Sequence, residues 1–107
     1  MRELTANERE LLTDPDALAA YDNYEVLTKM GELLREMRQH AGLSQQQLQE
    51  LSGIHQSDIS RAERGMAERG PSLSVLARMV HATGYSLVLS LRKRDAAPGS
   101  PELTVEI

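Results

Sequence analysis

The sequence predicts an all-α domain that ends in a short β-strand. Two observations lead to this fold class. Apolar residues recur at three- and four-residue spacing along several segments between residues 24 and 84, as on one face of a helix. From Tyr85 the spacing changes to two, with Leu87, Leu89 and Leu91 on one side, which is typical of a strand with one apolar face. A chain of 107 residues has room for one such domain with a short extension.

The N-terminal segment predicts two short helices. Thr5 and Glu8 have the spacing of a capping box, which would begin a helix that runs through Leu12. Asp14-Pro15 reads as a cap followed by proline at the first helical position, opening a helix from Asp16 to about Asp22. We therefore treat residues 1–23 as a helical extension.

Four further helices are expected in the domain that we place at residues 24–92. The longest runs from Tyr24 to His40, with inward positions at Val26, Leu27, Met30, Leu33, Leu34 and Met37. Capping signals then predict three short helices: Gln45 to Ser52, with Leu48 and Leu51 inward, Gln56 to Arg64, and Leu73 to just before Gly84. The strand lies at the C-terminal end of these four helices, and the family resemblance given below implies a five-helix type of domain.

The strand from Tyr85 to Leu91 needs a partner. It could pair with Leu103–Val105 in the same chain or with its own copy in a second chain. We favour the second chain, and hence a dimer, because residues 93–107 are rich in Pro, Gly and acidic residues and read as a flexible acidic tail.

Charge is distributed unevenly. The chain has a net charge of −4, but residues 1–34 carry 3 basic and 8 acidic side chains, residues 35–94 carry 9 and 5, and residues 95–107 carry 0 and 3. A basic middle is thus flanked by acidic ends.

The composition also bears on where the protein works. The absence of cysteine excludes disulfide and thiolate chemistry. No apolar run is long enough for a membrane span or signal peptide, so we expect a cytoplasmic protein without membrane contact.

The helix from Gln56 to Arg64 has one distinctive side. At 100° per residue, five polar side chains without an acid share this side: Gln56, Ser57, Ser60, Arg61 and Arg64. Asp58, Ile59, Ala62 and Glu63 lie opposite and are expected to pack on other helices. Two helices joined by a tight turn, the second with such a face, form a helix-turn-helix that enters the major groove of DNA. A helical hairpin with a solvated face is the alternative.

Enzyme chemistry is not expected. His55, Ser57 and Asp58 are close in sequence but project in different directions, so a nucleophile, base and orienting group could not converge. The three histidines have no metal-ligand spacing. We expect no catalytic residue, no cofactor and no metal.

The run AGLSQQQLQELSGIHQSDISRAERG, followed by PSLSVLARMVHATG, resembles the Cro/CI-type (Xre-type) helix-turn-helix regulators. The resemblance implies double-stranded DNA as the ligand, with base-reading residues Gln56, Ser57, Ser60 and Arg61. It also implies backbone contacts near Ser44 and Gln45, to which we add Arg64 and Arg69. Arg38 and Glu63 correspond to a structural ion pair of the family. Gln49 departs from the family pattern, which usually has alanine there.

The chain ends resemble another group. LLTDPDALAAYDNYE and GYSLVLSLRK are similar to segments of HigA-like and HipB-like antitoxins of toxin-antitoxin modules. This resemblance implies a homodimeric repressor on an inverted-repeat operator, a strand that pairs across the dimer, and a toxin partner of the RNase or kinase class. A stand-alone repressor, or an interaction module that has lost DNA binding, remains the alternative.

Overall fold

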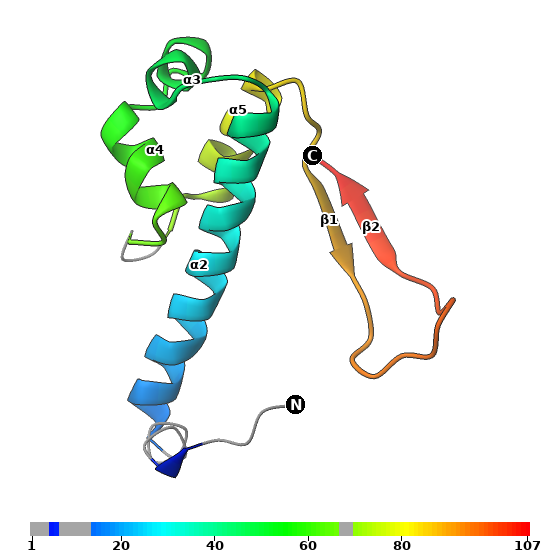
Figure 1. Ribbon diagram of the computed structural model, residues 1–107. Helices are drawn as coiled ribbons and strands as arrows, with labels where there is room; N and C mark the ends of the chain where they lie inside the picture. Colours follow the sequence, from blue (N-terminus) through cyan, green and yellow to red (C-terminus); the bar gives the residue numbers. More distant parts are fainter. Residues whose placement is uncertain (1–4, 7–13, 67–69) are drawn as a thin grey trace.

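The computed structural model describes residues 5–6, 14–66 and 70–107. Among them are four helices, α2 (Pro15–His40), α3 (Gln45–Ser52), α4 (Gln56–Glu63) and α5 (Leu73–Ala82), followed by strands β1 (Val88–Leu91) and β2 (Leu103–Glu106). The three short helices gather around the C-terminal half of α2, while the strands project on its other side (Figure 1). Most of the helix predicted from Thr5 to Leu12, residues 7–12, lies outside the described residues.

Helix α2 is longer than the sequence predicted. The side chain of Asp14 accepts a hydrogen bond from the N–H of Asp16, and Pro15 follows at the start, as expected for a capped helix. The helix then continues to His40 without a break. The two helices that we predicted, Asp16 to about Asp22 and Tyr24 to His40, are therefore one helix. No proline or glycine interrupts residues 16–30, and Ala19 and Ala20 favour helix, so nothing ends it at Asp22.

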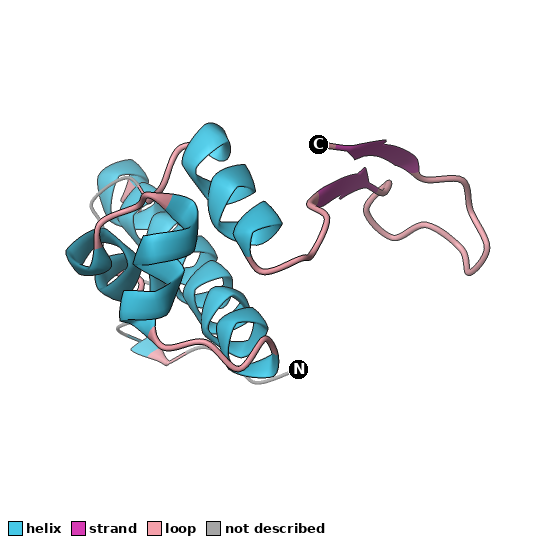
Figure 2. Cartoon of the chain, turned by 90° about the horizontal axis from the view of Figure 1, so that it is seen from above, coloured by secondary structure: helices cyan, strands magenta, loops and turns pink. Residues whose placement is uncertain are grey.

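The core lies between α2 and the three short helices. Seen from above, the helices form one cluster and the strands lie apart from it (Figure 2). The largest fully buried side chains of the core are Leu48 of α3, Ile59 of α4 and Met79 of α5. Leu34 and Met37 of α2 complete the contact. These aliphatic residues hold the short helices in place, because α3 and α4 have only eight residues each and such helices are not stable alone.

Three residues that we expected in the core are exposed. Val26 and Leu33 of α2 are 61% and 66% exposed, and Leu51 of α3 is 60% exposed. The predictions were wrong because α3, α4 and α5 cover only one side of α2. Val26 and Leu33 lie seven residues apart on a flank beyond that cover.

Helices α2 and α4 approach each other closely at Gly31. A Cβ atom on Gly31 would lie 2.5 Å from the carbonyl oxygen of Glu63 and 2.6 Å from that of Ala62. Contacts this short are too tight for a real Cβ atom. Gly31 therefore lets the C-terminal end of α4 rest directly on α2, which positions the helix that bears the predicted base-reading face.

The two strands form a hairpin within one chain. They pair antiparallel, with Leu89 opposite Val105 and Leu91 opposite Leu103. The C-terminal residue Ile107 extends the pairing, since its N–H donates to Leu87 and its carbonyl lies 2.9 Å from Nε2 of His81 in α5. Our preference for a strand partner in a second chain is thus wrong for this chain. The connecting loop bends at Asp95 and Gly99, both with positive φ, which returns the tail to β1.

No helix among the described residues is both long enough and apolar enough to cross a membrane.

Candidate nucleic-acid interface

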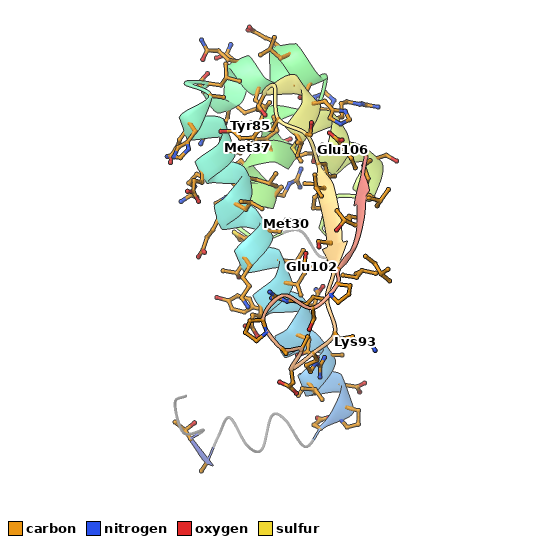
Figure 3. The ribbon with its side chains drawn as sticks, turned by 90° about the vertical axis from the view of Figure 1, so that its right-hand side faces the viewer. Met30, Met37, Tyr85, Lys93, Glu102 and Glu106 are labelled. Atoms are coloured by element: carbon orange, nitrogen blue, oxygen red, sulfur yellow. The ribbon has the colours of Figure 1, made fainter. Side chains whose placement is uncertain are left out.

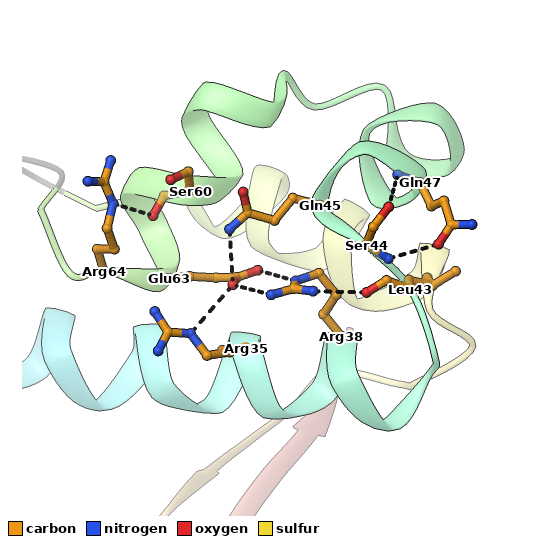
Figure 4. A network of polar contacts seen from close by, with 9 residues as sticks. All are labelled: Arg35, Arg38, Leu43, Ser44, Gln45, Gln47, Ser60, Glu63 and Arg64. Carbon is orange, nitrogen blue, oxygen red and sulfur yellow. Dashed lines mark hydrogen bonds and ion pairs between the residues drawn. The ribbon is translucent and has the colours of Figure 1, made fainter.

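Helix α3 begins with a complete capping box. The hydroxyl of Ser44 accepts from the N–H of Gln47, and the side chain of Gln47 accepts from the N–H of Ser44 (Figure 4). The first N–H groups of the helix still point out of its end, where a phosphate oxygen can bind. Ser44, predicted to contact the DNA backbone, therefore already uses its side chain for the cap.

The turn between α3 and α4 is held by buried contacts. Gly53 has φ 76°, a conformation that favours glycine, and Ile54 next to it is buried in the core. The buried hydroxyl of Ser52 donates to the carbonyl of Leu48 and accepts from the N–H of Ile54. The turn thus has its polar groups satisfied, and it fixes the angle at which α4 leaves α3.

Gln49 caps the start of α4. The residue before this helix, His55, makes no capping hydrogen bond with its side chain. Instead, the N–H of Gln56 donates to Oε1 of Gln49, at 2.6 Å. A side chain from α3 thereby satisfies one of the free N–H groups at the start of α4. The departure from the family's usual alanine has a physical role, which sequence spacing alone did not reveal.

The predicted face of α4 is open to solvent. Gln56, Ser57, Arg61 and Arg64 are exposed, and Ser60 is partly exposed. On the opposite side Ile59, Ala62 and Glu63 are buried, as predicted. The structure thus brings the five polar side chains together on one surface. Arg69 lies outside the described residues.

Asp58 differs from the prediction. We expected it to pack on other helices, but its side chain is 56% exposed and its Oδ1 atom lies 3.0 Å from Nη2 of Arg61. Arg61 also donates from Nε to the carbonyl of Ser57, and Arg64 does the same to Ser60. Both arginines therefore lie along their own helix. An exposed ion pair of this kind is weak, about 0.3–0.5 kcal/mol, so Arg61 is readily released to a stronger partner.

A buried carboxylate connects α4 to α2 and α3. Arg38 donates from Nε and Nη2 to the two oxygens of Glu63, at 2.7 and 2.8 Å, and from Nη1 to the carbonyl of Leu43 (Figure 4). The side chain of Glu63 is 1% exposed and that of Arg38 is 13% exposed. The two residues that we expected to pair are thus in bidentate contact, which is the strong geometry for an arginine and a carboxylate.

Two more side chains reach the same carboxylate. Nε2 of Gln45 donates to Oε1 of Glu63 at 3.4 Å, and Nε of Arg35 lies 3.7 Å from it. Gln45, predicted to contact phosphate, thus points inward to Glu63 here. Arg35 was not predicted, although its position three residues before Arg38 on the same helix could have indicated it. With two guanidinium groups around one carboxylate, the edge of this surface is basic.

The hydrogen bonds that Arg38 donates to Glu63 raise the pKa of Arg38 above its ordinary value; burial opposes part of the effect, and the charge of Glu63 adds to it. A raised pKa stabilises the folded state at every pH below the ordinary pKa of arginine, and this contribution is lost only as the pH rises through the folded-state pKa. Arg38 therefore stays charged in neutral and mildly alkaline solution.

The comparison with protein families decides what kind of domain carries this surface. A helix-turn-helix family model, HTH_3, matches residues 34–89, which is just over half of the 107 residues. The chain belongs to this family. The match runs from the C-terminal half of α2 into β1 and includes the whole of α3, the turn and α4. A search of curated proteins found no match.

Because the chain belongs to this helix-turn-helix family, it is a sequence-specific DNA-binding regulator. In such domains the second helix of the motif, here α4, enters the major groove with its N-terminal residues toward the base edges. The residues that the structure describes contain no group of three or more His, Asp or Glu side chains that could hold a metal ion.

Proposed function

We propose that the protein is a homodimeric repressor that binds an inverted-repeat operator near its own promoter. The observation that carries the proposal is the exposed polar face of α4, held in place by Gln49 at one end and by the Arg38–Glu63 pair at the other. Two such helices related by a two-fold axis would read half-sites about 10 bp apart.

Within this proposal, Gln56, Ser57, Ser60 and Arg61 read bases. Glutamine can pair with adenine and arginine with guanine, and each bidentate pair discriminates by about 1–3 kcal/mol. Arg64, together with Ser44 and Gln45 at the start of α3, would contact phosphates. Gln45 would then have to give up its hydrogen bond to Glu63, which is weak at 3.4 Å, while Arg38 keeps the carboxylate of Glu63 neutralised.

The test is binding of the purified protein to its own upstream DNA at two salt concentrations. Arg61→Ala should weaken binding at least tenfold by loss of a base contact, and Asp58→Asn should strengthen it a few-fold because it frees Arg61 and removes a negative charge near phosphates. Gln46→Ala, on the same surface of the domain but outside the predicted contacts, is the matched control. Failure of the wild type to bind would favour an interaction module that has lost DNA binding.

We further propose that this repressor is the antitoxin of a toxin-antitoxin module. Support comes from the resemblance of its ends to antitoxins and from the exposed acids that begin α2, Asp14, Asp16 and Asp22, which suit a basic, RNA-cleaving toxin. A kinase toxin is the alternative partner.

The antitoxin role can be tested with a chain that lacks residues 1–23, which removes these acids but ends before Leu27, the first residue of α2 in the buried core. Coexpressed with the product of the neighbouring gene, it should fail to relieve growth arrest while still binding the operator. Full relief of growth arrest by the shortened chain would exclude residues 1–23 from toxin capture, and absence of any arrest by the neighbouring gene would favour a stand-alone repressor.

A further inference from the structure

The β-hairpin has one apolar face and one polar face. Because β1 and β2 pair in register, alternate residues of both strands share a side. One side is mostly polar and carries Ser90, Thr104 and Glu106 together with Val88. The other carries six aliphatic residues: Leu87, Leu89, Leu91, Leu103, Val105 and Ile107. Only Leu87, at its base, packs against the helical core.

The apolar face is uncovered. Leu91 and Leu103 are 67% and 74% exposed, and every residue of both strands is classed as exposed. A two-stranded hairpin of this length is at best marginally stable in water, and its strands need a further layer to pack against. A continuous row of five exposed aliphatic side chains is also more than the scattered apolar residues of an ordinary surface.

A second apolar surface adjoins this face. Val26 and Leu33 of α2, which we had placed in the core, line the flank of α2 that α3 to α5 leave uncovered. A groove of about 410 Å³ separates this flank from the base of the hairpin, and its walls include Met30, Leu33, Met37, Tyr85 and Leu87. Figure 3 shows Met30, Met37 and Tyr85 from the side of the hairpin. The chain thus has two exposed apolar surfaces, the hairpin face and the flank of α2, on either side of this groove.

The charged residues beside the hairpin face and those beside the α2 flank have opposite signs. The hairpin loop begins with Arg92, Lys93 and Arg94, all exposed, and none of them forms an ion pair with another residue that the structure describes. The flank of α2 is bordered by Asp22, four residues before Val26, and by Glu36, three residues after Leu33. The loop lies level with the N-terminal half of α2 but apart from it, so its charges are open to another molecule (Figure 1).

A chain that carries both an apolar face with a basic end and an apolar flank with an acidic border is complementary to itself. This is what a two-fold symmetric interface requires, since the same patch is used by both subunits. The surface also lies on the side of α2 away from α4, so its occupation leaves the DNA-facing helix free (Figure 1).

We propose that the occupant is a second copy of this chain, with the apolar hairpin face of each subunit packed on the α2 flank of the other and its Arg92–Arg94 loop beside Asp22 and Glu36. The proposal rests on the homodimer of the proposed function and names its interface. It differs from pairing of β1 strands across the dimer, because contact is through the face of the hairpin and not its edge.

The test is the molar mass in solution, by light scattering and sedimentation equilibrium over a range of concentrations. The wild type should have twice the 11.9 kDa chain mass. Leu103→Lys should raise the dimer dissociation constant at least tenfold, whereas Thr104→Lys, one residue away on the polar face, should leave it within twofold. Both side chains are exposed, so both variants should retain the circular dichroism spectrum of the wild type.

The charge contribution has its own test. Reversal of the loop, R92E/K93E/R94E, should weaken the dimer several-fold at low salt, and a helix variant, D22K/E36K, should do the same. Mixing the two variants should restore association, because in the mixed dimer the acidic loop of one variant meets the basic helix of the other, and both contacts again join opposite charges. No restoration on mixing would overturn the pairing of loop with helix.

Three results would overturn the interface itself: a monomeric wild type at tens of micromolar, a dimer unaffected by Leu103→Lys, or equal weakening by Thr104→Lys. The failure of the DNA-binding proposal is distinguishable from these. A DNA duplex with a single half-site should bind the Leu103→Lys variant as tightly as the wild type, and loss of that binding would instead count against the assignment of α4.

Discussion

The two sides of α2 differ in how complete they are. On the side of α3 and α4, aliphatic residues are buried and every buried side-chain polar atom among the described residues has a hydrogen-bond partner. On the side of the hairpin, aliphatic residues are exposed and the basic residues Arg92 to Arg94 have no ion-pair partner among the described residues. The first side is ready to bind a polar ligand, while the second lacks an apolar layer.

This difference indicates how the protein divides its tasks. DNA is polar and hydrated, so a surface that recognises it can be exposed and still stable in the free protein. A protein partner that covers apolar residues leaves them in contact with water when it is absent. The complete side thus suits DNA, and the incomplete side suits the second copy of the chain that we propose for it.

The largest expected effect comes from breaking the complete side at its buried ion pair. Arg38→Ala should lower the free energy of unfolding by about 3–5 kcal/mol, because it leaves the buried charge of Glu63 without its bidentate partner. Urea unfolding would measure the loss. Arg92→Ala, an exposed arginine on the other side, should change stability by less than about 0.5 kcal/mol. Equal losses would show that the two sides do not differ as described.

A smaller loss should follow from changing the contact between α2 and α4. Glycine to alanine inside a helix usually stabilises a protein by about 0.5–1 kcal/mol, but Gly31→Ala should destabilise this one by about 1–3 kcal/mol, because the added Cβ collides with the backbone of Ala62. Thermal unfolding would give the sign. Glu32→Ala, at the next position and exposed, serves as the control, and a stabilised Gly31→Ala would contradict the close approach.

The smallest effect should come from the cap of α4. Gln49→Ala removes the acceptor for the N–H of Gln56 and should cost about 1 kcal/mol, with faster amide hydrogen exchange in the first turn of α4. Gln46→Ala, exposed on the same helix, should have no such effect, and Gln49→Glu should retain the cap. Unchanged exchange in Gln49→Ala would mean that the packing of Ile59 alone holds this helix in place.

Local signals predicted most of the helical domain. The capping box of Ser44 and Gln47, the cap at Asp14 and the stop at Gly53 are short-range hydrogen-bond and backbone patterns, and each is present in the structure. The polar face of α4 also follows from helical periodicity alone. The break that we predicted near Asp22 was wrong, because no local signal ends α2 there. Three further predictions failed: the inward positions of Val26, Leu33 and Leu51, the packing of Asp58, and the strand partner. Each of these depends on which other element lies nearby, and periodicity does not contain that information.

By itself, the sequence determined where most helices begin and end, which side of α4 is polar and which regulator family the chain resembles, because these depend on residues within a few positions of each other. Only the tertiary structure decided that Gln49 caps α4, that Gln45 points to Glu63, and that the tail folds back on β1. These features join residues between 7 and 18 positions apart, and their formation depends on the distances that the packed core sets between the helices.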